Sequence, residues 1–236
     1  MFQEILPNLF VIFPPDSGSN SYLLVGKKTA LIDSGLGKNP RDWRELLHLK
    51  GLMRESIDFV ILHTHAHADH FLGDKLFSNA QIFWPEIDAR PIELRDEEFT
   101  YLHFFNANFY EKFDQKTHHK GADNFFPPVH KKLKENEVID FSPFNLQVIQ
   151  TPGHTIGSVC FFDKKLKLLF SGDTLFNGSI GRFDLISGSK QQLFESIQKL
   201  KDLDFDFLLP GHGALLKGSQ KENFEQAINL LNPDNM

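Results

Sequence analysis

Four short apolar runs in this chain each end next to a residue that can bind a metal ion. The runs lead into His63, His154, Asp173 and His212, which lie far apart in the sequence. Side chains just beyond the carboxyl ends of strands can meet at one edge of a sheet. The pattern therefore predicts a fold in which these strand ends converge on one pocket. Because that pocket would draw on most of the 236 residues, we expect a single domain over residues 1–236.

The densest group of potential ligands is the segment 63–70, which reads His-Thr-His-Ala-His-Ala-Asp-His. Packing does not account for it, because buried neutral imidazoles would leave ring nitrogens without hydrogen-bond partners. Residues two apart in an extended segment face the same way, so His65 and His67 can hold one ion. Asp69 and His70, where the chain turns into a helix, can face another ion.

Three distal residues are the natural complement of this segment. His154 and His212 each follow a predicted strand and a Pro-Gly turn, and Asp173 can bridge two ions through its two carboxylate oxygens. Imidazole and carboxylate ligands suit zinc, and iron or manganese are alternatives. We therefore predict that the chain binds two divalent metal ions, with zinc preferred.

Composition sets expectations about location and partners. With 25 Lys and Arg against 31 Asp and Glu, the chain lacks the basic excess typical of nucleic-acid-binding proteins. No apolar stretch is long enough to span a bilayer, and residues 1–15 lack the features of a signal peptide, which predicts a cytoplasmic protein. The single cysteine, Cys160, lies in an apolar run, so we expect a packed side chain rather than a catalytic thiol.

The segment 86–136 differs from the rest of the chain. It is rich in aromatic residues, and four large apolar residues follow helical spacing: Leu102, Phe105, Phe109 and Phe113. We expect a helical insertion whose aromatic stripe belongs to the core, covers an apolar acyl group as a lid, or forms the face of a homodimer. Outside this segment, strands and helices occur in each half of the chain, as in an α/β fold of two packed sheets with outer helices.

Four segments resemble the metallo-β-lactamase superfamily, namely residues 64–70, 151–155, 171–176 and 210–213. Residues 172–182 are similar to its hydroxyacylglutathione hydrolase, or glyoxalase II-like, branch. The resemblance implies a four-layer αββα sandwich. It also implies one metal ion on His65, His67 and His154, a second on Asp69, His70 and His212, and Asp173 between them.

Three more residues are expected near this site. The resemblance implies that Asp33, which ends a predicted strand, braces the histidine segment. His63 shares a face with His65 and His67, but the family motif does not use this position as a ligand, so we expect it to support the ligands. Arg182 follows two glycines, and it can either hold a substrate carboxylate at the pocket rim or pair with Asp184 at the surface.

The leading hypothesis for function is metal-dependent hydrolysis of a small-molecule thioester or related ester of the S-acylglutathione type. Two ions would bind a hydroxide between them as the nucleophile, and Asp69 would orient it and pass a proton to the leaving group. One alternative is a mononuclear iron persulfide dioxygenase, in which two histidines and an aspartate hold the iron. Another is a non-enzymatic metal-binding scaffold whose insertion recruits a protein partner.

Overall fold

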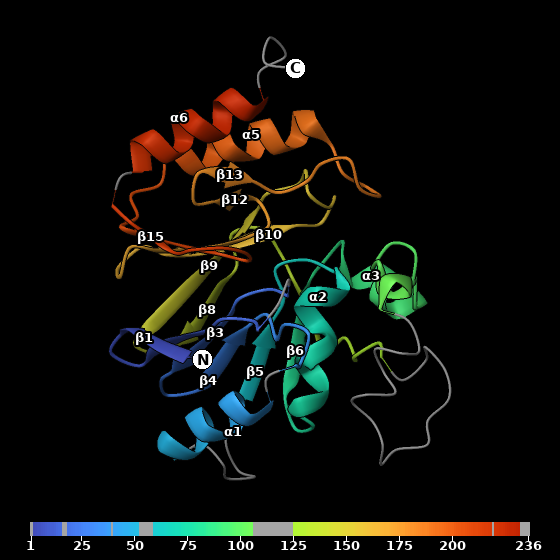
Figure 1. The fold of residues 1–236 in the computed structure, drawn as a ribbon, viewed down its shortest axis with the longest axis vertical. Helices are drawn as coiled ribbons and strands as arrows, with labels where there is room; N and C mark the ends of the chain where they lie inside the picture. The colour runs from blue at the N-terminus through green and yellow to red at the C-terminus, as the bar shows by residue number, and fades with distance from the viewer. Residues whose placement is uncertain are drawn as a thin grey trace.

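The computed structural model describes residues 2–15, 18–38, 40–51, 59–105, 125–218 and 220–231. Two β-sheets pack face to face, and helices cover the outer face of each sheet (Figure 1). Helices α5 and α6 lie over one sheet at the top of Figure 1, whereas α1 and α2 lie along the other. The expected αββα sandwich is confirmed.

The first sheet has seven strands in the order β1 to β7. Neighbouring strands are antiparallel from β1 to β4 and parallel from β4 to β7. The parallel part places the carboxyl ends of β4, β5 and β6 at one edge, where polar residues follow them. The strands are β1 (Phe2–Leu6), β2 (Leu9–Ile12), β3 (Ser21–Val25), β4 (Thr29–Ile32), β5 (Phe59–Leu62), β6 (Gln81–Pro85) and β7 (Lys131–Leu133).

Helices make the crossovers between the parallel strands of the first sheet. They pack large apolar residues such as Trp43 and Phe71 against the outer face of that sheet, beside Leu31 and Ile61. The helical elements are α1 (Pro40–Leu49), α2 (Ala68–Phe71), the 3-10 helix η1 (Leu72–Leu76), α3 (Ala89–Leu94) and the 3-10 helix η2 (Leu102–Phe104).

The second sheet has six strands in the order β15-β14-β11-β10-β9-β8, and only the pair β11 and β14 is parallel. A two-stranded hairpin of β12 and β13 follows β11. The elements are β8 (Val138–Phe141), β9 (Phe144–Gln150), β10 (Val159–Asp163), β11 (Leu168–Gly172), β12 (Leu175–Phe176), β13 (Ser179–Ile180), α5 (Lys190–Lys201), β14 (Phe207–Pro210), β15 (Leu216–Lys217) and α6 (Gln220–Leu231).

Strand β10 shows how the sequence sorts side chains between two cores. Val159 and Phe161 belong to the core between the sheets, whereas Cys160 and Phe162 belong to the core beneath α5 and α6. This alternation is what a strand with both faces covered requires. Burial raises the pKa of Cys160 to about 11, so the thiol is neutral and packed, as expected from the sequence.

The segment 86–136 is only partly the helical insertion that the sequence predicts. Its described residues contain the short helices α3 and η2, but its last part forms strand β7, which pairs in parallel with β6. The prediction of a helical segment is wrong there because the free edge of β6 offers backbone partners: Ile82 and His130 exchange two hydrogen bonds of 2.9 Å. Phe109 and Phe113 lie outside the described residues.

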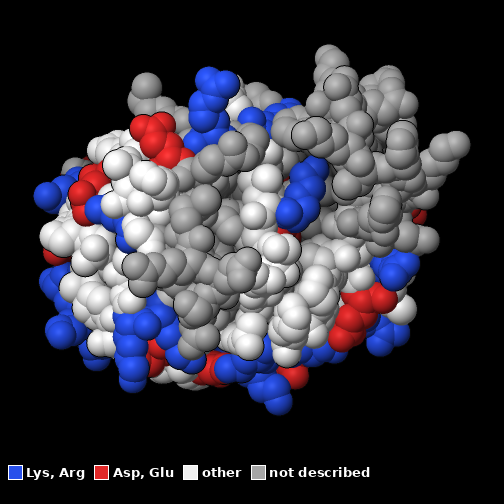
Figure 2. Space-filling model, turned by 90° about the horizontal axis from the view of Figure 1, so that it is seen from below, with Lys and Arg blue, Asp and Glu red and all other residues white. Residues whose placement is uncertain are grey.

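The described surface carries both signs of charge. Figure 2 shows Lys, Arg, Asp and Glu side chains interspersed, with no continuous basic patch on the described part of this face. Among the described ranges, no helix has the combination of length and apolar character that crossing a bilayer demands.

Candidate metal centre

The edges of the two sheets meet at a cluster of histidines and aspartates. The loop after β5 supplies four of them, and the loops after β9, β11 and β14 supply one each. The structure thus brings together all seven residues that the sequence singles out as ligands: His65, His67, Asp69, His70, His154, Asp173 and His212.

The cluster divides into groups of three. His65, His67 and His154 form one group, in which the potential ligand atoms lie within 4.8 Å of one another. A second group of the same compactness is the set Asp69, His70 and His212, and a third, His65, His70 and Asp173, overlaps both. The first two sets coincide with the two ligand sets that the resemblance implies.

Asp173 lies between the two groups. Its Oδ2 is 3.5 Å from His154 Nε2 and 3.4 Å from His212 Nε2, and its Oδ1 is 3.4 Å from His70 Nε2. Gly211 makes this approach possible, because a Cβ atom at that position would lie 2.3 Å from Asp173 Oδ1. The carboxylate is therefore placed where it can contact an ion in either group.

The nitrogens that face the cluster have no hydrogen-bond partner. Nε2 of His65, His67, His70 and His154 is buried and unpaired, and so is Asp173 Oδ1. Several buried polar atoms left unpaired at one place would cost about 1–3 kcal/mol each. A divalent cation would satisfy them together, and imidazole with carboxylate is a donor set that zinc, iron and manganese accept. The residues present therefore fit a metal site.

The other ring nitrogen of three histidines is held by a partner that fixes the ring. His70 Nδ1 donates to Asp33 Oδ2 at 2.8 Å, and His154 Nδ1 donates to the carbonyl of Arg182 at 2.6 Å. His65 Nδ1 lies 3.0 Å from the Thr64 hydroxyl, which itself donates to Asp33 Oδ2 at 2.8 Å. With Nδ1 protonated, Nε2 of each ring presents a lone pair to the centre.

Asp33 anchors the histidine loop to the end of β4. Besides the two side-chain contacts, its Oδ1 accepts from the backbone N–H of Thr64 at 2.9 Å. Burial alone would raise the pKa of Asp33, but the neighbouring imidazoles of His70 and His63 lower it to about 2. The negative charge of Asp33 thus holds the His70 ring directly and the His65 ring through Thr64.

The protonation of the two groups differs. Burial lowers the pKa of His65, His67 and His154, that of His67 to about 3, so these rings are neutral, which is the form that binds metal ions. Burial also acts to lower the pKa of His70 and His212, but the carboxylate of Asp173 outweighs it and raises both. A divalent cation would replace the protons that these two rings otherwise bind.

His63 lies behind the cluster rather than in it. Its Nε2 is 2.9 Å from Asp74 Oδ2, its Nδ1 is 3.5 Å from Asp33 Oδ1, and its ring stacks on Trp84 with centroids 4.1 Å apart. Burial would lower the pKa of His63, but Asp74 and Asp33 raise it to about 9. His63 is thus an imidazolium held between two carboxylates.

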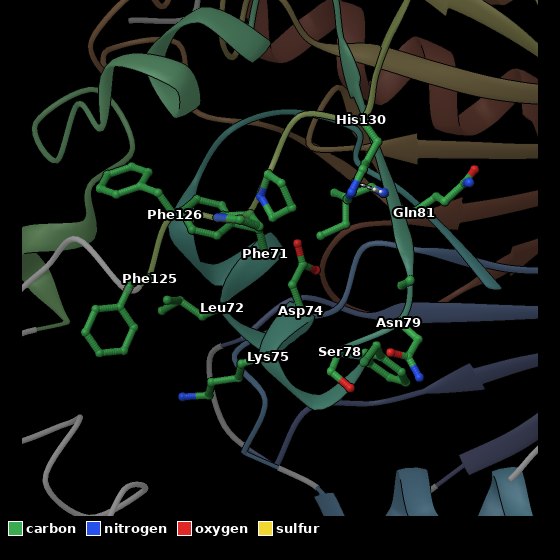
Figure 3. Close-up of a pocket in the computed structure, with 15 residues that line it drawn as sticks. Phe71, Leu72, Asp74, Lys75, Ser78, Asn79, Gln81, Phe125, Phe126 and His130 are labelled. Atoms are coloured by element: carbon green, nitrogen blue, oxygen red, sulfur yellow. Dashed lines mark hydrogen bonds between the residues drawn. The ribbon is translucent and has the colours of Figure 1, made fainter. Parts of the chain in front are cut away.

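Asp74 also borders a pocket of about 480 Å³ that is separate from the seven residues (Figure 3). Phe71, Leu72 and Asp74 from α2 and η1 line it, and Phe125 and Phe126 lie beside them, with the ring centroids of Phe71 and Phe126 6.3 Å apart. None of the seven clustered residues lines this pocket.

Asp88 is a site residue that sequence reasoning missed. Its buried carboxylate accepts from the backbone N–H of Ala66 at 2.9 Å and from the hydroxyl of Thr155 at 2.8 Å. It therefore joins the loop of His65 and His67 to the loop of His154. Asp88 lies three residues after an apolar strand, as the expected ligands lie close to strand ends, but it is not part of any of the four segments that resemble the superfamily. Burial raises its pKa to about 6.

Two residues near β3 hold the turn that carries His212, and these were also missed. Asn20 Nδ2 donates to the carbonyls of Pro210 and Gly213, each at 3.0 Å, and the Tyr22 hydroxyl donates to the Pro210 carbonyl at 2.6 Å. Both residues are buried. No local pattern signals these contacts, because the partners are about 190 positions away.

Arg182 takes the second of the two arrangements considered for it. Its guanidinium donates to both carboxylate oxygens of Asp184, at 2.9 and 2.8 Å, and both side chains are exposed. Arg182 reaches the cluster through its backbone carbonyl, which holds His154.

The fold and the clustered side chains together define an αββα protein with a metal centre where its two sheets meet. The sequence matches the metallo-beta-lactamase superfamily over residues 14–212, and the chain belongs to that superfamily.

Similar proteins include metallohydrolases. The chain is 32% identical to the probable metallo-hydrolase MJ0888 of Methanocaldococcus jannaschii over 202 residues, which cover 84% of this chain and 88% of that protein. It is 30% identical to the hydroxyacylglutathione hydrolase GloC of Haemophilus influenzae over 174 residues, covering 72% and 76% of the two chains. The crystal structure of TTHA1623 in a di-iron-bound form is similar with a TM-score of 0.62 and 28% identity, covering 87% and 94%.

Proposed function

We propose that this protein is a binuclear metallohydrolase that cleaves a thioester or related ester. The observation that carries the proposal is the pair of three-residue groups with Asp173 between them. Two groups with a shared carboxylate fit two ions, whereas a mononuclear dioxygenase would leave the group of Asp69, His70 and His212 without a role. The hydroxyacylglutathione hydrolase name of GloC and the di-iron form of TTHA1623 support the reaction class and the metal count.

Paired divalent ions, when bound, lower the pKa of water to about 7 and polarise a carbonyl oxygen. The chain itself supplies the neutral imidazoles and carboxylates that hold the ions, together with the Asp33 and Arg182 contacts that orient the rings. No thiol is needed as the nucleophile, and Cys160 could not act as one, because it is buried with its pKa raised to about 11.

Asp69 is the residue of this chain best placed to handle a proton. Its side chain is 24% exposed and lies 3.1 Å from His212 Nε2, so its carboxylate is both near the centre and open to a substrate. The pKa of Asp69 is lowered because His70 and His212 outweigh the effect of burial, which keeps it ionised at neutral pH. An ionised carboxylate at this position can accept a hydrogen bond from the attacking water and return a proton to the leaving group.

The test is thioesterase activity as a function of metal content. Chelator-treated protein should be inert, and addition of zinc, manganese or iron should restore turnover of an alkyl thioester. Metal analysis should find two ions per chain. Metal-replete protein that hydrolyses no thioester or ester would contradict the proposal, and one iron per chain with oxygen uptake would support the dioxygenase instead.

A further inference from the structure

An open hollow of about 460 Å³ borders the metal centre on the side of His67. Tyr101 lines this hollow and contacts the His67 ring edge-to-face, with centroids 5.1 Å apart, so it connects the hollow to the metal centre. The hollow is lined by Glu97, Glu98, Tyr101, His103, Phe104 and Ile186.

The walls of this hollow are attached to the ligand loops. The backbone N–H of Ala68, between His67 and Asp69, donates to the carbonyl of Thr100 at 2.9 Å. The Tyr101 hydroxyl accepts from the N–H of Ile186 at 2.7 Å, which ties the two sides of the hollow together. The hollow and the metal centre are therefore one structural unit.

Large apolar side chains are exposed at this place. Phe104 stacks on Tyr101 with centroids 5.7 Å apart and is 69% exposed, and Ile186 is 39% exposed. Ile156, two residues after His154, is 44% exposed, and its N–H bonds to the Ser187 hydroxyl beside Ile186. Apolar surface left open beside a reactive centre is covered favourably by an apolar part of a ligand.

The charges around the hollow disfavour an anionic ligand. The six lining residues include two glutamates and no lysine or arginine. Arg182, whose carbonyl holds His154, has its guanidinium bound to Asp184 through two hydrogen bonds. A carboxylate entering the hollow would thus face two like charges, and pairing with Arg182 would require breaking an existing ion pair.

Building on the proposed hydrolase function, we infer that the natural substrate is a thioester or ester with an uncharged, apolar group that lies against Tyr101, Phe104 and Ile186. Glutathione thioesters, whose tripeptide carries two carboxylates, are the poorer substrates. The substrate expected at this metal centre thus differs from the glutathione thioester in the name of the hydroxyacylglutathione hydrolase GloC.

The experiment compares kcat/KM of the metal-replete enzyme for two matched pairs of alkyl thioesters. One pair varies the acyl group, phenylacetyl against succinyl, on N-acetylcysteamine. The other varies the thiol, benzyl mercaptan against glutathione, with a butanoyl acyl group. We expect the apolar member of each pair to be favoured by about tenfold or more, which corresponds to about 1.4 kcal/mol.

Variants connect this preference to the hollow. Phe104→Ala should reduce kcat/KM for the favoured apolar thioester by about fivefold and leave its anionic partner unchanged, because only the apolar group contacts the ring. Val138→Ala, which truncates a 61% exposed side chain on the edge strand β8, is the matched control and should have no effect. Glu97→Gln combined with Glu98→Gln should improve turnover of the anionic member.

The results distinguish failure of the substrate preference from failure of the hydrolase activity. Preference for the anionic member of either pair, or equal effects of Phe104→Ala and Val138→Ala, would overturn the substrate inference and leave the hydrolase proposal standing. Enzyme with both ions bound that cleaves none of the four thioesters would overturn the hydrolase proposal and the inference with it.

Discussion

Replacing Asp88 tests whether one buried carboxylate holds the first group of ligands together. In Asp88→Ala, the N–H of Ala66 and the hydroxyl of Thr155 lose their acceptor, and both are buried. The Thr155 hydroxyl can still donate to Ser158 Oγ, 2.7 Å away, so the N–H of Ala66 is the donor left unpaired. A buried donor left unpaired costs about 1–3 kcal/mol, which is the expected loss in the free energy of unfolding. Total stabilities of about 5–15 kcal/mol make such a loss easy to measure.

Asp88→Asn is the matched control. The amide oxygen can accept the same two hydrogen bonds, and the substitution removes the carboxyl group whose pKa burial raises to about 6. We therefore expect Asp88→Asn to unfold at a denaturant concentration close to that of the wild type. The difference between the two variants isolates the hydrogen bonds from the charge.

Asp88→Ala should weaken metal binding only at the group of His65, His67 and His154. Without Asp88, the loop of His154 loses one of its contacts to the loop of His65 and His67, whereas Asp69, His70 and His212 keep their supports. Loss of such a supporting contact weakens metal binding by about 10–100-fold. Cobalt titration, followed by visible absorption and equilibrium dialysis, should show one weakened site and one unchanged site in Asp88→Ala. Two sites of wild-type affinity, with stability equal to that of Asp88→Asn, would refute the role given to Asp88.

Three further predictions follow from the buried groups. The pKa of His63 is raised to about 9 from 6.5, so its stabilising contribution of about 3 kcal/mol is complete below pH 6.5 and lost as the pH rises through 9. Denaturant unfolding of metal-free wild type and His63→Gln should therefore give a stability difference that shrinks between pH 6 and pH 10, and a constant difference would contradict the assignment. Tyr22→Phe removes one of the two donors to the Pro210 carbonyl, which keeps its hydrogen bond from Asn20, so the loss should be about 0.5–1.5 kcal/mol of stability and should weaken the group of His212 more than that of His154. Equal weakening of both sites in a cobalt titration would argue against this. Cys160 should not react with Ellman's reagent at pH 8 in the native protein and should react fully in denaturant, since it is buried with its pKa raised to about 11; rapid reaction of the folded protein would be inconsistent with the core placement.

The two-sheet arrangement and the meeting of the seven residues follow from local sequence patterns. Each ligand-bearing loop comes directly after a short apolar strand, and strand position can be read from apolar runs and Pro-Gly turns without knowledge of the fold. Spacing separated His65 and His67 from Asp69 and His70, but the assignment of His154 and His212 to these pairs came from the resemblance. Spacing alone gives no distance between residue 67 and residue 154.

The supports of the centre were harder to predict. Asp88 acts on Ala66 and Thr155, and Asn20 acts on the turn near Gly213, so each contact exists only once the tertiary structure has formed. Strand β7 was missed for a similar reason, because three residues with two lysines become a strand only when β6 offers an edge. A local pattern specifies an element, but it does not specify the partner that the element will meet.

The attachment of the Pro210 turn to Asn20 and Tyr22 has a consequence for biosynthesis. A growing polypeptide emerges from the ribosome with its amino-terminal strands first, and β14 is translated near the end. Until β14 and the turn after it have been translated, the group of Asp69, His70 and His212 lacks one of its three potential ligands. A second ion, if the proposed binuclear centre is correct, would therefore be bound only after β14 has been translated, and a product truncated before Pro210 would offer at most the group of His65, His67 and His154.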